Sequence, residues 1–163
     1  MVSLFCFFKE LYLIRISLFN AMDILKINQS DCELYQQERE LRNEVLLRPI
    51  GLPDFGWEQN DHIADHFVAV KDSIVIGCVI LVKKDNNRAQ LMQMAVKEEY
   101  QSKGIGKELL KRLLEHATNH NIKEVYCHAR ENAIPFYLKN KFEVYDKPFV
   151  EVGVVHNYMK YVI

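Results

Sequence analysis

Hydrophobic residues occur in short runs along the chain, and their spacing predicts three consecutive strands followed by a helix. Apolar runs at 66–70, 74–82 and 89–96 are separated by polar breaks at 71–72 and 84–88, a pattern typical of a strand meander. From Gly104 to about Thr118 the apolar positions recur with helical spacing, which predicts an amphipathic helix. The buried face of this helix is expected to contain Ile105, Leu109, Leu110, Leu113, Leu114 and Ala117.

A helix and a long loop are predicted before this meander. Ser30 and Glu33 have the spacing of a capping box, which predicts the start of a helix that continues to about Leu47. The pair Arg48-Pro49 is expected to stop this helix, because the residue before a proline is disfavoured in the helical region. Residues 49–62 contain two prolines and two glycines and predict a long loop, which in a compact domain is often functional.

The C-terminal part predicts a strand at 124–130, a short helix at 133–141 and a closing hairpin from 142 to the C-terminus. With a first short strand at 22–28, the order is strand, helix, three strands, helix, strand, helix, two strands. This order predicts an α/β fold, in which helices flank a central mixed sheet.

The turn before the predicted helix at 104–118 contains Gly104 and Gly106, with a lysine on either side of the glycines. Unpaired N–H groups and the positive end of the helix dipole favour a phosphate at such a helix start. A mononucleotide P-loop is excluded because Glu108 follows Lys107, and a dinucleotide fingerprint is excluded because Leu109 replaces its third glycine. A tight turn without a ligand remains one alternative. A pyrophosphate-binding Gln/Arg-x-x-Gly-x-Gly/Ala pattern, which matches at every defined position, is the other.

The motifs of this chain resemble those of a known family. Residues 92–106 resemble the acetyl-CoA-binding motif of the GNAT superfamily of acyl-CoA-dependent N-acyltransferases. Gly77 after a short strand, HARENAIPFYLKNKF at 128–142 and EVGVVHNYM at 151–159 extend the likeness, which looks most like the ElaA-like group. The resemblance covers the chain from Met22 to the C-terminus. It implies a single GNAT N-acetyltransferase domain at 22–163.

Composition excludes some functions. The 163 residues contain 21 Lys and Arg against 22 Asp and Glu, with no basic run of the kind that binds nucleic acid. Four cysteines without a CxxC pair favour a reduced, cytoplasmic protein, and no ligand spacing predicts a metal site. Residues 1–21 are apolar, but charges interrupt them too often for a membrane span. We interpret them as an N-terminal extension; an added structural element or an interfacial anchor is the alternative.

The resemblance implies how acetyl-CoA would be bound. The backbone of Met94 and Val96 is expected to pair with the pantetheine arm as an extra strand would. Asn132 is expected to hold the same arm through its side chain, unless it serves only as a helix N-cap. The pyrophosphate is expected on the loop formed by Gln101, Ser102, Lys103, Gly104, Ile105, Gly106 and Lys107.

Acyl transfer to an amine requires a base near the amine and a hydrogen-bond donor near the departing sulfur. The resemblance assigns the donor role to Tyr137, for which packing alone is the alternative. Glu151 and His156 are candidates for the base. Gln93 is expected to face opposite to Met92 and Met94, where it would contact the acceptor or solvent. Further acceptor contacts are expected from His66, His128 and Arg130, the last two on one strand face.

The sequence therefore predicts an N-acetyltransferase that transfers an acetyl group from acetyl-CoA to a primary amine of a small molecule or peptide. The alternative is a catalytically inactive acyl-CoA-binding module that acts as a sensor or interaction partner. The expected partners are acetyl-CoA and an amine, with neither nucleic acid nor membrane, in a monomer or homodimer.

Overall fold

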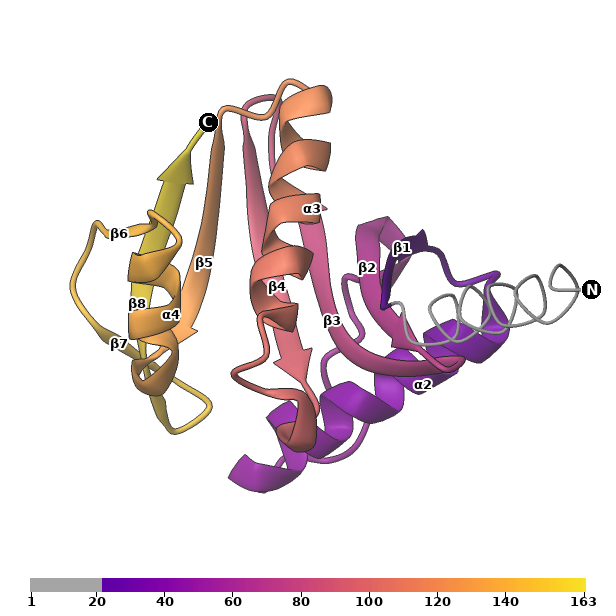
Figure 1. Cartoon of the computed structure of the whole chain (residues 1–163). Coiled ribbons are helices and arrows are strands. Elements are labelled where there is room, and N and C mark those ends of the chain that lie inside the picture. The colour runs from indigo at the N-terminus through magenta and orange to yellow at the C-terminus, as the bar shows by residue number, and fades with distance from the viewer. Residues whose placement is uncertain (1–21) are drawn as a thin grey trace, which may run out of the picture.

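A computed structural model describes residues 22–163, which form one mixed sheet with helices on both faces (Figure 1). The strands are ordered β1-β2-β3-β4-β5-β8-β6, and β7 also pairs with β8. The predicted α/β fold is confirmed, whereas the predicted extension at 1–21 lies outside the described residues. The strands are β1 (Asp23–Ile27), β2 (Ala64–Lys71), β3 (Ile74–Lys83), β4 (Arg88–Val96), β5 (Glu124–Arg130), β6 (Glu143–Val144), β7 (Phe149–Glu151) and β8 (Val154–Val162).

Three α-helices accompany the sheet: α2 (Cys32–Arg42), α3 (Ile105–Asn119) and α4 (Ile134–Lys139). The predicted apolar face of α3 is confirmed, since Leu109 and Leu113 are fully buried in the core that covers one side of the sheet. Leu41 of α2 packs on the other side, against Val68 and Cys78. Each fully buried aliphatic side chain of this kind stabilises the fold by about 1.5–3 kcal/mol. No helix within residues 22–163 is long and apolar enough to cross a membrane.

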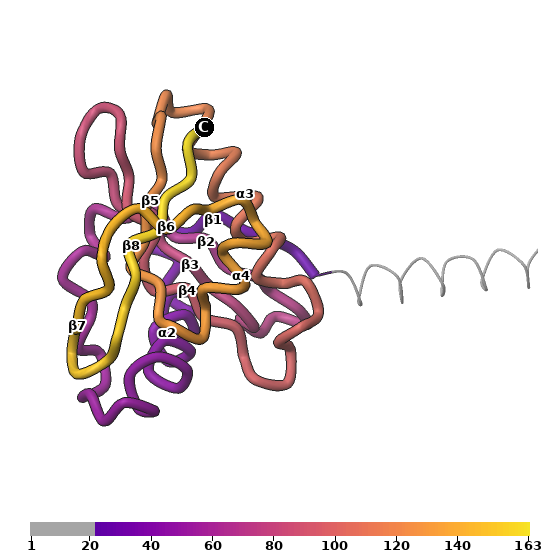
Figure 2. Tube along the Cα trace, turned by 90° about the vertical axis from the view of Figure 1, so that its left-hand side faces the viewer, coloured from indigo at the N-terminus to yellow at the C-terminus, as the bar shows by residue number. Residues whose placement is uncertain are grey.

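The separation of β4 and β5 shapes the molecule. The two strands pair in parallel from Arg88 with Glu124 to Leu91 with Cys127, and then diverge, which opens the gap visible in Figure 1. Helices α3 and α4 lie together on one side of the sheet, and the β7–β8 hairpin projects on the other (Figure 2). Beyond Leu91 and Cys127 the two strands are therefore not hydrogen-bonded to each other.

The start of α2 differs from the prediction. Asp31, not Ser30, occupies the N-cap position, and no side chain caps the helix, so the predicted capping box is wrong. The Asp31 carboxylate instead accepts a hydrogen bond of 2.8 Å from the backbone N–H of Asn28, because the preceding turn brings that group closer.

The end of α2 also differs. Helical backbone continues through a π-helical turn, Asn43–Leu47, and a 3₁₀ turn, Arg48–Ile50. Arg48 keeps helical dihedrals, φ −56° and ψ −41°, so the expected stop before Pro49 is wrong. Gly51 ends the segment with φ 72°, a left-handed conformation that glycine adopts without steric cost.

Two smaller expectations are also corrected. Gly77 lies within the ten-residue strand β3 rather than after a short strand. A Cβ atom there would lie 3.0 Å from Leu109 and 3.1 Å from Ile105, so glycine allows α3 to approach the sheet closely. The closing hairpin is divided, because β6 and β7 both pair with β8.

A buried polar network holds α2, the loop at 51–60 and β4 together. The Arg42 guanidinium donates two hydrogen bonds to the Asp61 carboxylate, at 2.9 and 2.6 Å, and both side chains are at most 4% exposed. Arg42 also donates to Gln93 Oε1 at 2.6 Å, and Gln93 Nε2 donates to the carbonyl of Trp57 at 2.5 Å. A bidentate charged pair is among the strongest hydrogen-bond arrangements, and here it anchors the loop to the helix.

His66 is the second buried charge in this region. Its Nδ1 lies 2.9 Å from the Glu38 carboxylate, and its Nε2 lies 2.9 Å from the carbonyl of Asp61. An ionised Glu38 and the Asp61 carbonyl both accept, so this arrangement favours the imidazolium form, in which both ring nitrogens donate. Burial disfavours this cation, but the Glu38 carboxylate outweighs burial and raises the pKa of His66 above its ordinary value of 6.5.

Replacing Asp61 with asparagine tests the network. We expect Asp61→Asn to lower the free energy of unfolding by about 3–5 kcal/mol, because Arg42 would remain buried without its carboxylate. Glu124→Gln is the matched control. It breaks the Arg88–Glu124 pair, whose side chains are 45% and 24% exposed, and should cost less than about 1 kcal/mol. Denaturant unfolding measures both losses, and equally small values would show that the Arg42–Asp61 pair does not stabilise the fold.

The His66–Glu38 pair predicts a pH dependence of stability. Folding raises the pKa of His66, so the folded chain retains a proton that the unfolded chain releases above about pH 6.5. The contribution of the pair is complete below that pH and is lost as pH rises through the folded pKa. The stability advantage of the wild type over His66→Gln should therefore decrease between pH 6.5 and 9. Thermal and denaturant unfolding across this range, with the exposed His62→Gln as control, would reveal a constant advantage if His66 were neutral.

Candidate acyl-CoA and acceptor site

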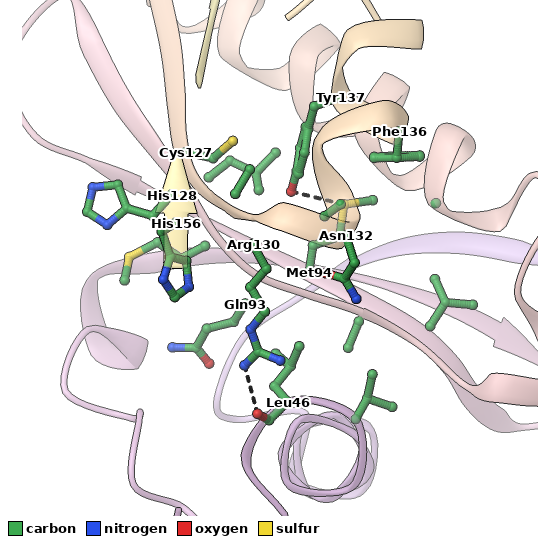
Figure 3. A pocket seen from close by; sticks show the side chains of 18 of the residues that line it. Leu46, Gln93, Met94, Cys127, His128, Arg130, Asn132, Phe136, Tyr137 and His156 are labelled. Carbon is green, nitrogen blue, oxygen red and sulfur yellow. Dashed lines mark hydrogen bonds between the residues drawn. The ribbon is translucent and has the colours of Figure 1, made fainter. Parts of the chain in front are cut away.

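The gap between β4 and β5 contains a cavity of about 1190 Å³. Its walls come from β4, β5, the turn before α3, α4 and the end of the α2 segment, as Figure 3 shows for the side chains nearest its centre. The volume exceeds that of an ordinary small-molecule site.

The glycine turn forms one end of this cavity. Gly104 has φ 84°, and a Cβ atom added to it would meet no protein atom within 4 Å, so the space beside it is open to a ligand. Ile105 then begins α3, and its side chain is 6% exposed, which leaves its backbone N–H as its polar contribution. The free N–H groups of this helix start are suited to a phosphate.

The other residues predicted for this turn differ in their placement. Gln101, Ser102, Gly106 and Lys107 line the cavity. Lys103 does not line the cavity; its ammonium lies 5.4 Å from the centre of the Tyr100 ring.

Part of the backbone of β4 faces the cavity. Met94 and Val96 follow the last residue that pairs with β5, so their backbone borders the gap. Gln101 Nε2 donates to the Val96 carbonyl at 3.0 Å and thereby ties the glycine turn to this strand. Buried backbone groups need partners, and a ligand with amide groups would supply them here.

A bulge changes the faces of β4. The register between β3 and β4 shifts near Cys78, and Gln93 adopts φ 53°. Met94 Sδ consequently lies on the α4 side, 3.7 Å from the Tyr137 hydroxyl, while Met92 Sδ lies 3.9 Å from Asn60 Nδ2 in the loop on the other side. The expectation that Met92 and Met94 share a face opposite to Gln93 is therefore wrong.

Tyr137 projects from α4 toward β4 (Figure 3), and its side chain is 5% exposed. The hydroxyl donates to the Met94 sulfur, a weak acceptor that a better one would replace. Burial, together with the neighbouring Cys127, holds the pKa of Tyr137 well above its ordinary value. The hydroxyl therefore remains a proton donor at neutral pH.

Asn132 lies just before α4 and points into the same gap (Figure 3). Ala133 is the N-cap residue of α4, and no side chain caps that helix, so the alternative role of Asn132 as a cap is not observed. Gly106 faces Phe136, where a Cβ atom would approach the ring to 3.3 Å, and this close packing sets the distance between α3 and α4.

The opposite side of the cavity is built from β5, β7 and β8. His128 Nδ1 lies 3.5 Å from a carboxylate oxygen of Glu151. His156 is 4% exposed, and its Nδ1 lies 2.9 Å from the carbonyl of Val154. Because a carbonyl only accepts, Nδ1 carries the proton in the neutral ring and Nε2 is left as an acceptor. The geometry thus assigns the tautomer that a base requires.

The sequence of this chain matches a known family over most of its length. The profile of the Acetyltransferase (GNAT) family matches residues 23–142. The chain belongs to the GNAT acetyltransferase family. The resemblance predicted from the motifs is therefore confirmed.

Solved structures share the fold of this GNAT domain. ElaA from Escherichia coli is 20% identical, with a TM-score of 0.76 over 86% of this chain and 99% of ElaA. An acyl-CoA N-acyltransferase from Pseudomonas aeruginosa is 18% identical, with a TM-score of 0.75 over 86% of this chain and 99% of its own. A GNAT family acetyltransferase from Elizabethkingia anophelis with acetyl-CoA bound is 20% identical, with a TM-score of 0.67 over 87% of this chain and 98% of its own.

One predicted acceptor residue of the GNAT domain lies elsewhere. His66 is fully buried, both of its nitrogens are occupied by Glu38 and Asp61, and it does not line the cavity, so its expected contact with the acceptor is wrong. Gln93, His128 and Arg130 do line the cavity. Cys78 and Cys127 are buried free thiols.

Sequence reasoning missed several residues of the cavity. Trp57 and Asn60 line it from the loop before β2, and Gln90 lines it from β4. A single tryptophan in a proline- and glycine-rich loop was an available signal, because exposed aromatic loop residues often bind ligands. Arg42 and Asp61, which position Gln93, gave no local signal. Within residues 22–163, no group of three or more His, Cys, Asp or Glu side chains is arranged to hold a metal.

Gly104 provides a test of the phosphate site. Valine at this position would strain a backbone with φ 84° and would place a branched side chain in the open space beside the turn. Calorimetry should show acetyl-CoA affinity falling at least about tenfold, or by about 1.4 kcal/mol. Gly51→Val is a matched control, since Gly51 has φ 72° and does not line the cavity. Unchanged affinity in a folded Gly104→Val protein would contradict a phosphate at this turn.

Proposed function

We propose that this GNAT domain transfers an acetyl group from acetyl-CoA to a primary amine of a small molecule or peptide, by direct attack of the amine on the thioester. The observation that carries the proposal is the divergence of β4 from β5 between the glycine turn and Tyr137. It brings a helix start suited to a phosphate, the edge of β4 and the buried Tyr137 hydroxyl to one cavity. Acetyl-CoA offers a pyrophosphate, two amides and a thioester in the same order.

The residues of the α3 and α4 side would hold the acyl donor. The turn at 101–107 would bind the pyrophosphate, while the backbone of Met94 and Val96 and the side chain of Asn132 would bind the amides. Acetyl-CoA, when bound, supplies the activated acyl group. Tyr137 would exchange its weak contact with Met94 for a hydrogen bond to the thioester sulfur, which strengthens as negative charge develops there.

The residues on the opposite side would prepare the amine. Removing the proton of an alkylamine at pH 7 costs about 4 kcal/mol, since its pKa is about 10.4. His156, with Nε2 free to accept, is our first candidate for this base, directly or through a water molecule. Glu151 is the second candidate. Its carboxylate would act together with His128, whose Nδ1 lies 3.5 Å from it.

A catalytically inactive acyl-CoA-binding module is the second candidate function. The buried Tyr137 hydroxyl beside Met94, with its raised pKa, favours the enzyme, since a binding module has no need for a buried proton donor. An amine panel with a thiol-release assay separates the two functions. Tight acetyl-CoA binding by calorimetry, without release of CoA thiol above the rate of hydrolysis for any amine, would support the module.

The proposal also includes a cytoplasmic location, where the described cysteines remain reduced.

Tyr137→Phe tests the chemistry. The substitution keeps the ring packing and removes the hydroxyl, so acetyl-CoA affinity should change little. Turnover should fall by about 10²–10⁴-fold, the range for a positioned proton donor. The loss should lie in kcat, because the hydrogen bond strengthens during the reaction. Tyr161→Phe, in the core and outside the cavity, is the control. Wild-type turnover of Tyr137→Phe would assign the tyrosine a packing role.

A further inference from the structure

Arg130 is the last residue of β5 and points away from the α3 and α4 side. The side chains of Val125, Cys127 and Ala129 enter the core beneath α3, so Arg130 belongs to the opposite strand face. Its guanidinium crosses the gap and donates one hydrogen bond of 2.8 Å to the carbonyl of Leu46 (Figure 3). The Trp57 ring centre lies 6.0 Å from Cζ. Arg130 therefore reaches the acceptor side of the cavity.

This cation has no carboxylate partner in the described structure. Among residues 22–163, no Asp or Glu oxygen lies within the 4.0 Å of an ion pair with Arg130, although the Glu151 carboxylate pairs with the nearby His128. Burial lowers the pKa of Arg130, and no neighbouring carboxylate opposes this effect. A guanidinium stays charged at neutral pH and has five N–H donors, of which the Leu46 carbonyl takes one. Arg130 also lines the cavity, where its other donors are available to a ligand.

The charged side chains that line the cavity are mostly cationic. Among the described residues its lining contains four cationic side chains, Lys84, Lys107, Arg130 and Lys139, against one carboxylate, Glu151. The whole chain, in contrast, has a net charge of −1. Lys107 lies on the first turn of α3, beside the phosphate site. Arg130 lies on the other sheet face, so the phosphates proposed for acetyl-CoA do not account for it.

Bracing of the α2 segment is the simpler role for Arg130. The carbonyls at a helix C-terminus lack helical partners, and a cation there gains from the helix dipole. One hydrogen bond to Leu46 satisfies this role, yet a lysine or a polar side chain would serve it equally. The planar guanidinium of an arginine, with further N–H donors available in a cavity, is suited to bidentate binding of a carboxylate.

We propose that Arg130 binds a carboxylate of the acceptor, so that the substrate of this enzyme is an amine that also carries a carboxylate group. This inference rests on the function proposed above. Arg130 pairs with His156 across the β5–β8 ladder, and side chains of such cross-strand pairs lie on the same face. The candidate base and the carboxylate anchor thus share one wall, which is where the two ends of one small acceptor would be held.

Matched acceptors test the proposal. Glycine, β-alanine and 4-aminobutanoate would each be compared with the corresponding carboxamide in a thiol-release assay, using wild type, Arg130→Gln and Arg130→Lys. The ratio of kcat/KM between acid and amide should fall about 10- to 100-fold in Arg130→Gln, because a charge-assisted bidentate contact is lost. Using the change in this ratio cancels the different basicities of the amines. Arg112→Gln, on the exposed face of α3, removes the same charge and should leave the ratio unchanged.

A binding measurement on the wild-type protein separates this inference from the proposed function. Butanoate added to the acetyl-CoA complex should shift the ¹⁵N signal of Arg130 Nε, while butanamide should not. A shift without turnover of any amine would retain the carboxylate site and reject the transferase. Turnover without a shift, or an acid-to-amide ratio that Arg130→Gln leaves unchanged, would reject the carboxylate site and leave Arg130 as a brace. The wild-type signal decides the question even if Arg130→Gln fails to fold.

Discussion

The parallel pairing of β4 with β5 ends at Leu91 and Cys127, and the whole cavity depends on this interruption. A sheet that remained paired would satisfy its own backbone and leave no opening. Buried backbone N–H and C=O groups need hydrogen-bond partners. Where β4 and β5 no longer pair, an amide-bearing ligand can supply them. The same interruption lets the cavity reach both faces of the sheet, since Tyr137 lines it from α4 and Leu46 from the segment after α2.

The bulge at Gln93 is maintained by buried charge. A non-glycine residue with φ 53° is costly and persists only where its surroundings hold it. Arg42 supplies this restraint through Gln93 Oε1, and Asp61 holds Arg42. A buried ion pair contributes little net stability compared with apolar packing, but it is specific about geometry, because a misplaced partner leaves an uncompensated charge. We infer that the network maintains the shape of β4 at the reacting centre.

The two faces of the sheet have different chemistry. The α3 and α4 side offers backbone N–H groups, a glycine turn and the Tyr137 hydroxyl, which match the phosphates, amides and sulfur of an acyl-CoA. The α2 side offers titratable side chains, among them His128, Glu151, His156 and Arg130. Backbone groups recognise a constant ligand, whereas side chains recognise a variable one. The division explains why the donor follows from the family and the acceptor must be inferred from individual residues.

Features with a local cause were predictable from the sequence. The glycine turn and the apolar face of α3 depend on neighbouring residues, and spacing located them. Tyr137 was singled out by the resemblance to the family. Other predictions failed where a distant group intervened. The predicted capping box does not form, and the Asp31 carboxylate instead accepts a hydrogen bond from the backbone N–H of Asn28. Met92 and Met94 do not share one strand face, because a bulge at Gln93 lies between them.

The sequence by itself determined the family through its motifs, and most of the elements through its periodicity, because both depend on backbone conformation over a few residues. Only the tertiary structure decided which histidine is a buried cation and which lines the cavity. His66 meets Glu38 across 28 positions of the chain, and Arg130 meets Leu46 across 84. Contacts over such distances depend on the packing of several strands and helices, so the acceptor side became visible only when the chain was folded.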